Sequence, residues 1–222
     1  MVNIITGNGK LTEKKEFSTG ITIPAHIFSY VFHPLFIPVY VSCFLLYWHP
    51  FTFAGFSSAA KSKLLATVFV NLTFFPAITV FLLWRLKFVS SFLLRTQKER
   101  IVPYAAAMIF YFWGWYVLRN FNEIPVVFKQ FLLGSFITVI AAWLANIYFK
   151  ISMHALALGG MALFILYITY SAEGSSGQYA SISLLITGIV CTSRMIVSDH
   201  RPVEIYSGLV IGILCQLLAI WL

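Results

Sequence analysis

The chain has 222 residues, of which 60% are hydrophobic, 18% aromatic and only 10% charged, and its mean hydropathy is +0.87. A soluble domain cannot bury that much apolar surface in one core, so the composition excludes a soluble globular protein and indicates an integral membrane protein. The net charge of +8 fits basic residues at cytoplasmic helix ends and an anionic lipid partner. We expect membrane lipids around the chain and no nucleic-acid partner.

The apolar runs have the length that an α-helix needs to cross a bilayer, and they lack the period-two alternation of an outer-membrane barrel. We therefore predict an all-α fold, a polytopic transmembrane helical bundle of about seven spans (six to seven), in a single membrane domain over residues 1–222. A polar N-terminal tail, residues 1–26, precedes a first span that we expect to serve as an uncleaved anchor. The predicted spans are Ile27–Trp48, Lys63–Trp84, Ile101–Leu118, Pro125–Tyr148, Ser152–Tyr170, Tyr179–Ile196 and Val203–Leu222.

Prolines mark bends and starts within these spans. Pro34 and Pro38 are expected to kink the first span, because proline removes a backbone donor and clashes with the preceding turn. Pro103, Pro125 and Pro202 stand where a helix can begin without losing a hydrogen bond.

Basic residues are distributed unequally between the two ends of the predicted bundle. Because successive spans alternate in direction, the N-terminal tail and the segments after the second, fourth and sixth spans share one face. Eleven of the 15 Lys and Arg residues fall on that face. By the positive-inside rule we expect this face to be cytoplasmic, in the inner (plasma) membrane of a bacterium.

Three short segments on the shared face hold most of the groups capable of chemistry: residues 95–100, 150–154 and 193–204. Ionisable groups are costly to place next to lipid, so we expect them to line a shared polar cavity. His200 and Glu204 are four residues apart, so on a helix beginning near Pro202 the carboxylate can hold one imidazole nitrogen and leave the other free as a nucleophile.

The third segment must also contain a turn. The six-residue step from Arg194 to His200 does not fit one helix face. A turn between them brings both side chains to one pocket, and Ser198 or Asp199 is the expected cap of the helix that follows.

The third segment resembles a motif of the type 2 phosphatidic acid phosphatase superfamily, to which the vanadium haloperoxidases also belong. The family motif is S-R-x5-H-x3-D, and it is matched by Ser193, Arg194 and His200, with Glu204 in place of Asp. Two glycines at a four-residue spacing in the last predicted span are also typical of the family. The resemblance covers residues 95–212, the phosphatase-like core, whereas the first two spans match no motif.

The other two family motifs are matched less completely. P-S-G-H is represented by Ser152 and His154, with Ile and Met where the family has Pro and Gly. K-x6-R-P is represented by Arg100, and Lys98 and Arg95 stand nearby in place of the family lysine. All three matches occur in the family order and on one predicted face.

The resemblance implies a membrane-bound phosphatase that hydrolyses a lipid phosphate or an isoprenoid diphosphate through a phosphohistidine, with no cofactor and no metal. Its cations then come from side chains, because no acidic cluster for magnesium is present. In this interpretation His200 is the nucleophile and His154 the general acid and base. The implied catalytic residues are His200, His154 and Glu204, and the implied phosphate-binding residues are Arg194, Arg100, Lys98, Ser152 and Ser193.

Two alternatives remain open. One is a lipid phosphotransferase that uses the same phosphohistidine, and the other is a non-catalytic membrane protein that retains an anion-binding pocket. The remaining polar residues have ordinary interpretations as interfacial groups, snorkelling side chains or hydrogen bonds between helices. These residues are His26, His33, His49, Asn71, Asn146 and Lys129.

Overall fold

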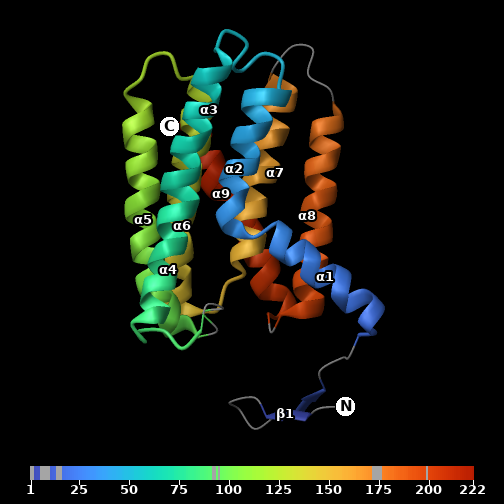
Figure 1. Cartoon of the computed structure of the whole chain (residues 1–222). Helices are drawn as coiled ribbons and strands as arrows, with labels where there is room; N and C mark the ends of the chain where they lie inside the picture. Colours follow the sequence, from blue (N-terminus) through green and yellow to red (C-terminus); the bar gives the residue numbers. More distant parts are fainter. Residues whose placement is uncertain are drawn as a thin grey trace.

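The computed structural model describes residues 3–5, 11–13, 17–91, 94, 96–171, 177–198 and 200–222. Seven helical segments in this part of the chain are long and apolar enough to cross a membrane, and they stand together as a bundle (Figure 1). The all-α class is therefore confirmed, and the chain is an integral membrane protein. A short antiparallel hairpin of β1 (Asn3–Ile5) and β2 (Leu11–Glu13) precedes the bundle.

The first span begins earlier than predicted and is broken in the middle. Its helix α1 starts at Thr19, within the segment expected to be a polar tail. His33 precedes a proline and is extended, with φ −63° and ψ 139°, because a residue before proline is pushed out of the helical region. The predicted kink is thus confirmed. The span consists of α1 (Thr19–Val31), η1 (Pro34–Phe36), α2 (Ile37–Cys43) and η2 (Phe44–Trp48).

The break gives α1 its own direction. In Figure 1 α1 departs from the line of α2 and crosses the lower part of α8, the helix against which it packs. Only Ala25 and Ser29 of α1 are buried, while Ile21, Ile23 and Ile27 are exposed. Large apolar residues exposed in this way are typical of a surface next to lipid, as expected for a part of the first membrane span.

The second and third spans flank the bundle opposite α1. The second contains α3 (Ser58–Phe69), the π-helical turn η3 (Val70–Phe74) and α4 (Phe75–Arg85). The third is α5 (Gln97–Arg119), which starts at a capping box formed by Thr96 and Glu99. Pro103 therefore lies inside α5 and not at its start, contrary to our expectation, because the capping box starts the helix at Gln97, six residues earlier.

The last four spans contain the most buried helix of the molecule, α7. Of the seven spans, α7 has the largest share of buried residues, and it packs against α6, α8 and above all α9. Gly159 of α7 and Gly212 of α9 have backbone of the partner helix where a side chain would stand, so the two helices approach at backbone distance. The bounds are α6 (Val126–Tyr148), α7 (Met153–Ser171), α8 (Gly177–Val197) and α9 (Pro202–Trp221).

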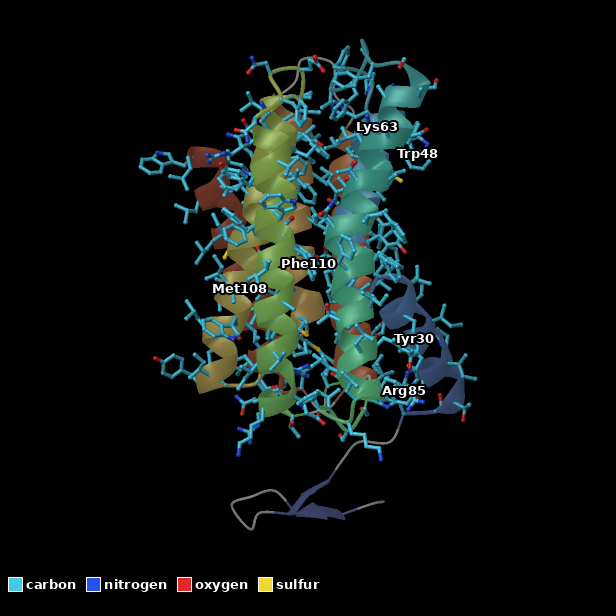
Figure 2. The ribbon with its side chains drawn as sticks, turned by 60° about the vertical axis from the view of Figure 1, so that its left-hand side comes forward. Tyr30, Trp48, Lys63, Arg85, Met108 and Phe110 are labelled. Atoms are coloured by element: carbon cyan, nitrogen blue, oxygen red, sulfur yellow. The ribbon has the colours of Figure 1, made fainter. Side chains whose placement is uncertain are left out.

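The two ends of the bundle differ in the groups that they present. We call the motif end the one where α5, α7 and α9 begin and where α4, α6 and α8 end. Arg85 lies toward this end, whereas Trp48 and Lys63 lie toward the other (Figure 2). Exposed aromatic residues such as Tyr148 and Trp221 stand at helix ends, as is usual at membrane–water interfaces.

Candidate functional site

A histidine–glutamate pair at the start of α9 is the best-defined polar contact of the motif end. His200 Nδ1 lies 2.8 Å from Glu204 Oε2, and only 5% of the His200 side chain is exposed. A carboxylate accepts and does not donate, so Nδ1 carries the hydrogen and Nε2 keeps its lone pair in the neutral ring. The predicted four-residue pairing is present, and it leaves a nucleophilic nitrogen on a nearly buried imidazole.

The turn before α9 is built differently from our expectation. Arg201 is the N-cap of α9, and its N–H donates to Glu204 Oε2 over 3.2 Å. Ser198 instead hydrogen-bonds the carbonyl of Arg194 and accepts from the N–H of His200 at 3.4 Å. Ser198 therefore ends α8 and does not cap α9, because Glu204 already satisfies the first amide of that helix. Asp199, the other candidate cap, lies outside the described residues.

Arg100 joins the start of α5 to the segment before α7. It is 7% exposed, and it donates from Nε to the carbonyl of Leu94 (2.8 Å) and from Nη1 to that of Ile151 (3.3 Å). The next residue, Ser152, donates its N–H to the carbonyl of Glu204 at 3.2 Å. Three segments that are distant in sequence thus meet through backbone carbonyls at the motif end.

A second clamp fixes the same end of α5 to α6. Gln97 donates its side-chain amide to the carbonyl of Asn146 over 3.0 Å, and Asn146 donates to the carbonyl of Gln97 over 2.9 Å. This pair of bonds confirms the expected interhelical role of Asn146. It also fixes the position of Arg100, one turn further along α5.

His154 lies in the first turn of α7, close to three other members of the motif end. Its Nε2 is 3.0 Å from the carbonyl oxygen of Ser29 in α1. It lies within electrostatic range of Arg194, His33 and His200. His154, His200, Arg194 and Arg100 therefore lie at one end of the bundle, which is the arrangement that span parity predicts.

His33 is a member of this cluster that the sequence did not indicate. Its ring centroid is 5.5 Å from that of His154, at an interplanar angle of 81°, and its Nδ1 accepts the N–H of Leu35 at 3.4 Å. We expected His33 to be an interfacial or hydrogen-bonding group, and it does accept a hydrogen bond, but the sequence did not indicate its contact with His154. The available signal was an ionisable residue beside the prolines of a membrane span, since such residues usually face the bundle interior.

Two predicted phosphate-binding residues do not join the cluster. Lys98 is exposed, and it lies two residues from Arg100 on α5, a spacing that puts side chains on different helix faces. Ser193 donates to the carbonyl of Ile189 in its own helix at 2.8 Å and faces the groove between α8 and α1.

Ser152, also predicted to bind phosphate, is fully buried, and its Oγ accepts the N–H of Ala155 at 3.5 Å, so it caps α7. Arg95 lies outside the described residues.

The surroundings of His200 favour its neutral form. Burial lowers the pKa of His200, and the charges of Arg100 and Lys150 lower it further, while the hydrogen bond and charge of Glu204 act in the opposite direction. Among the described residues no three His, Cys, Asp or Glu side chains gather in a way that could hold a metal ion. The charge that can meet an anion at the motif end is carried by Arg and Lys.

A cavity of about 90 Å³ extends from the motif end into the bundle between α5, α6, α7 and the broken first span. At the motif end the cavity is lined by three residues close in sequence to the polar cluster. Pro34 follows His33, Tyr104 lies one turn after Arg100, and Met153 precedes His154. The cavity reaches Met161, two turns deeper along α7, a depth of about 12 Å at 1.5 Å per residue. The walls are mostly apolar, and the residues that line them do not include His33, Arg100, His154, Arg194 or His200.

No family model, no curated protein and no solved structure matches the chain. The geometry of the motif end is therefore the basis on which a function can be assigned to this chain.

Proposed function

We propose that this protein is an integral membrane phosphatase that acts on a lipid phosphate or an isoprenoid diphosphate through a phosphohistidine on His200. The observation that carries the proposal is the 2.8 Å bond between His200 Nδ1 and Glu204, made at the end of the bundle that also holds His154 and Arg194. A buried neutral imidazole with one nitrogen tied to a carboxylate is an activated nucleophile. Cationic side chains beside it are suited to phosphoryl oxygens.

In the first step His200 Nε2 attacks phosphorus, the bond from phosphorus to the leaving oxygen breaks, and the leaving oxygen takes a proton from protonated His154. In the second step His154 takes a proton from water, the water oxygen bonds to phosphorus, and the phosphorus–nitrogen bond breaks. Arg194 and the Nη2 end of Arg100 neutralise charge on the transferred group. Within the described residues the hydrogen bonds of Arg100 use only Nε and Nη1.

The cavity supports a substrate with an apolar chain. It starts at Met153, which precedes His154 in the sequence, and continues between the helices with mostly apolar walls, so a hydrocarbon chain attached to a phosphate at the motif end would have apolar space nearby. Pockets of this kind bury apolar surface and use a few polar groups to fix orientation. A water-soluble sugar phosphate has no group that would fill this space.

The decisive experiment measures phosphate release by purified protein from phosphatidate, phosphatidylglycerol phosphate and undecaprenyl diphosphate. We expect release that persists in excess EDTA, stops with vanadate, and is absent in His200→Ala. His26→Ala, which replaces an exposed histidine of α1, is the matched control and should retain activity. If the wild type binds these lipids but releases no phosphate from any of them, the chain is a binding protein and the proposal is wrong.

We also propose that the motif end faces the cytoplasm, because seven of the 11 described Lys and Arg residues belong to the segments of that end and four to those of the other. In sealed inside-out vesicles, a lipid substrate added from outside should then be hydrolysed without detergent. Right-side-out vesicles should need detergent for the same activity. The reverse result would assign the site to the outer face.

A further inference from the structure

The last turn of α1 contacts His154 through two groups that lie outside the motif segments. The carbonyl oxygen of Ser29 is 3.0 Å from His154 Nε2, and the ring of His33 packs edge-on against that of His154, with centroids 5.5 Å apart. Ser29 lies in the last turn of α1 and His33 lies just after the helix ends, and both contact His154 at the start of α7. Ser29 is one of two buried residues in α1.

The contact with Ser29 determines which nitrogen of His154 carries hydrogen. A backbone carbonyl accepts hydrogen bonds and cannot donate, so His154 Nε2 must be the donor. In the neutral ring Nδ1 then holds the lone pair. A histidine whose second nitrogen is tied to a carbonyl has its tautomer and its ring orientation fixed, as in many metal and catalytic sites.

His33 is held in its place against His154 by the break in the first span. Its Nδ1 accepts the N–H of Leu35 at the start of η1, and Pro34 keeps its backbone extended. The ring therefore blocks rotation of His154 away from Ser29. Arg194 lies within electrostatic range of both histidines, so the pair belongs to the same polar cluster.

We infer that the turn Ser29–His33 is a positioning element of the proposed site and that it makes Nδ1 the reacting nitrogen of His154. The inference rests on the proposed function. Protonated His154 gives its Nδ1 hydrogen to the leaving oxygen as the ester bond breaks, and neutral Nδ1 later takes a proton from water. Throughout both steps His154 Nε2 keeps its hydrogen and donates it to the carbonyl oxygen of Ser29, and His33 holds the orientation of the His154 ring.

The first test compares His33→Asn with His33→Ala. Asparagine retains an oxygen that can cap η1, so His33→Asn removes the ring from His154 while keeping the start of η1. We expect both variants to lower kcat on a lipid phosphate about tenfold or more, because misplaced catalytic groups cost rate, with KM nearly unchanged. Phosphohistidine formation from p-nitrophenyl phosphate should survive, and its hydrolysis should slow. His26→Ala is the control.

A double-mutant cycle separates positioning from general stability. If His33 acts through His154, adding His33→Asn to His154→Ala should cause no further loss, since coupled residues are non-additive. A further loss equal to that of the single variant would overturn the inference, as would full activity in His33→Asn. Wild-type phosphate release is the reference for both outcomes.

A readout independent of activity tests the contact itself. Diethylpyrocarbonate modifies histidines that are accessible and neutral, and mass spectrometry of the peptide containing residue 154 measures the rate. We expect slow labelling of His154 in the wild type and labelling several times faster in His33→Asn. Unchanged labelling contradicts the contact. Absence of phosphate release by the wild type, together with faster labelling, would instead refute the proposed function and leave the contact standing.

Discussion

At the scale of single residues, His200 is in a setting that keeps the imidazole neutral. Burial is the main cause that lowers its pKa, and Arg100 and Lys150 act in the same sense from two other segments. Attack on phosphorus needs the neutral ring. In the proposed mechanism, the hydrogen bond from Nδ1 to Glu204 would stabilise the positive charge that develops on the ring as the bond to phosphorus forms.

We therefore predict that, with p-nitrophenyl phosphate as substrate, whose leaving group needs no acid, the rate of phosphohistidine formation rises with pH with a midpoint below about pH 6.5, the ordinary pKa of histidine. Because the folded pKa is lowered, the unfolded chain binds the proton first, so stability should also fall as pH drops below that value. Rapid-quench measurements of acid-labile phosphate between pH 4.5 and 8 test the rate. A rise of this rate with pH whose midpoint lies above pH 7 would contradict the assignment of His200 as the nucleophile.

Arg100 has a structural task in addition to any contact with substrate. Its guanidinium spans two carbonyls, those of Leu94 and Ile151, and a lysine ammonium has no fork with which to reach both. We predict that Arg100→Lys lowers the free energy of unfolding by about 1–3 kcal/mol, the usual cost of an unsatisfied buried group. Thermal unfolding in detergent measures it. Lost activity at an unchanged Tm would mean that Arg100 acts mainly on the substrate.

At the scale of helices, the close approach of α7 and α9 sets the relative position of His154 and Glu204. Gly208 of α9 would put a Cβ 2.9 Å from the carbonyl oxygen of Ser152, and Gly212 has backbone of Leu156 and Gly160 in the same position. No side chain can be added at these glycines unless one helix moves. The site and the helix packing therefore depend on the same contacts.

We predict that Gly212→Ala lowers both the Tm and the turnover of the lipid substrate, because it separates the helix that carries His154 from the helix that carries Glu204. Gly188→Ala in α8 is the matched control, since nothing lies within 4 Å of its added Cβ. Both properties should stay near wild type in that control. Equal effects of the two substitutions would show that any added methyl group disturbs the bundle.

The sequence predicted the spans well and the faces of their side chains less well. Apolar run length placed the ends of six spans within about five residues, because lipid imposes that length. It missed the early start of α1, whose apolar residues are mixed with Thr, Gly and Ser. Motif spacing correctly paired His200 with Glu204 within one turn. It could not show that Lys98 and Ser193 point elsewhere or that His33 meets His154, because these depend on helix rotation and on packing between distant spans.

At the scale of the whole molecule, the bundle combines a polar end with an apolar interior. The broken first span contributes to both, since His33 belongs to the polar cluster and Pro34 lines the cavity. α7 does the same, with His154 in its first turn and cavity-lining residues below it. This arrangement would suit the proposed substrate, which has a charged group and an apolar chain attached to it.

The cavity yields a prediction about chain length. Ala157 lines it on α7, three residues after His154, so Ala157→Phe should fill space directly below the proposed site. We expect a large rise in KM for a lipid phosphate with a long chain and little change in kcat/KM for p-nitrophenyl phosphate, which has no chain to bury. Ala77→Phe, at an exposed alanine of α4 that does not line the cavity, is the control. An equal loss on both substrates would mean that the substitution disturbs the site itself, and no loss on either would mean that the chain of the substrate lies elsewhere.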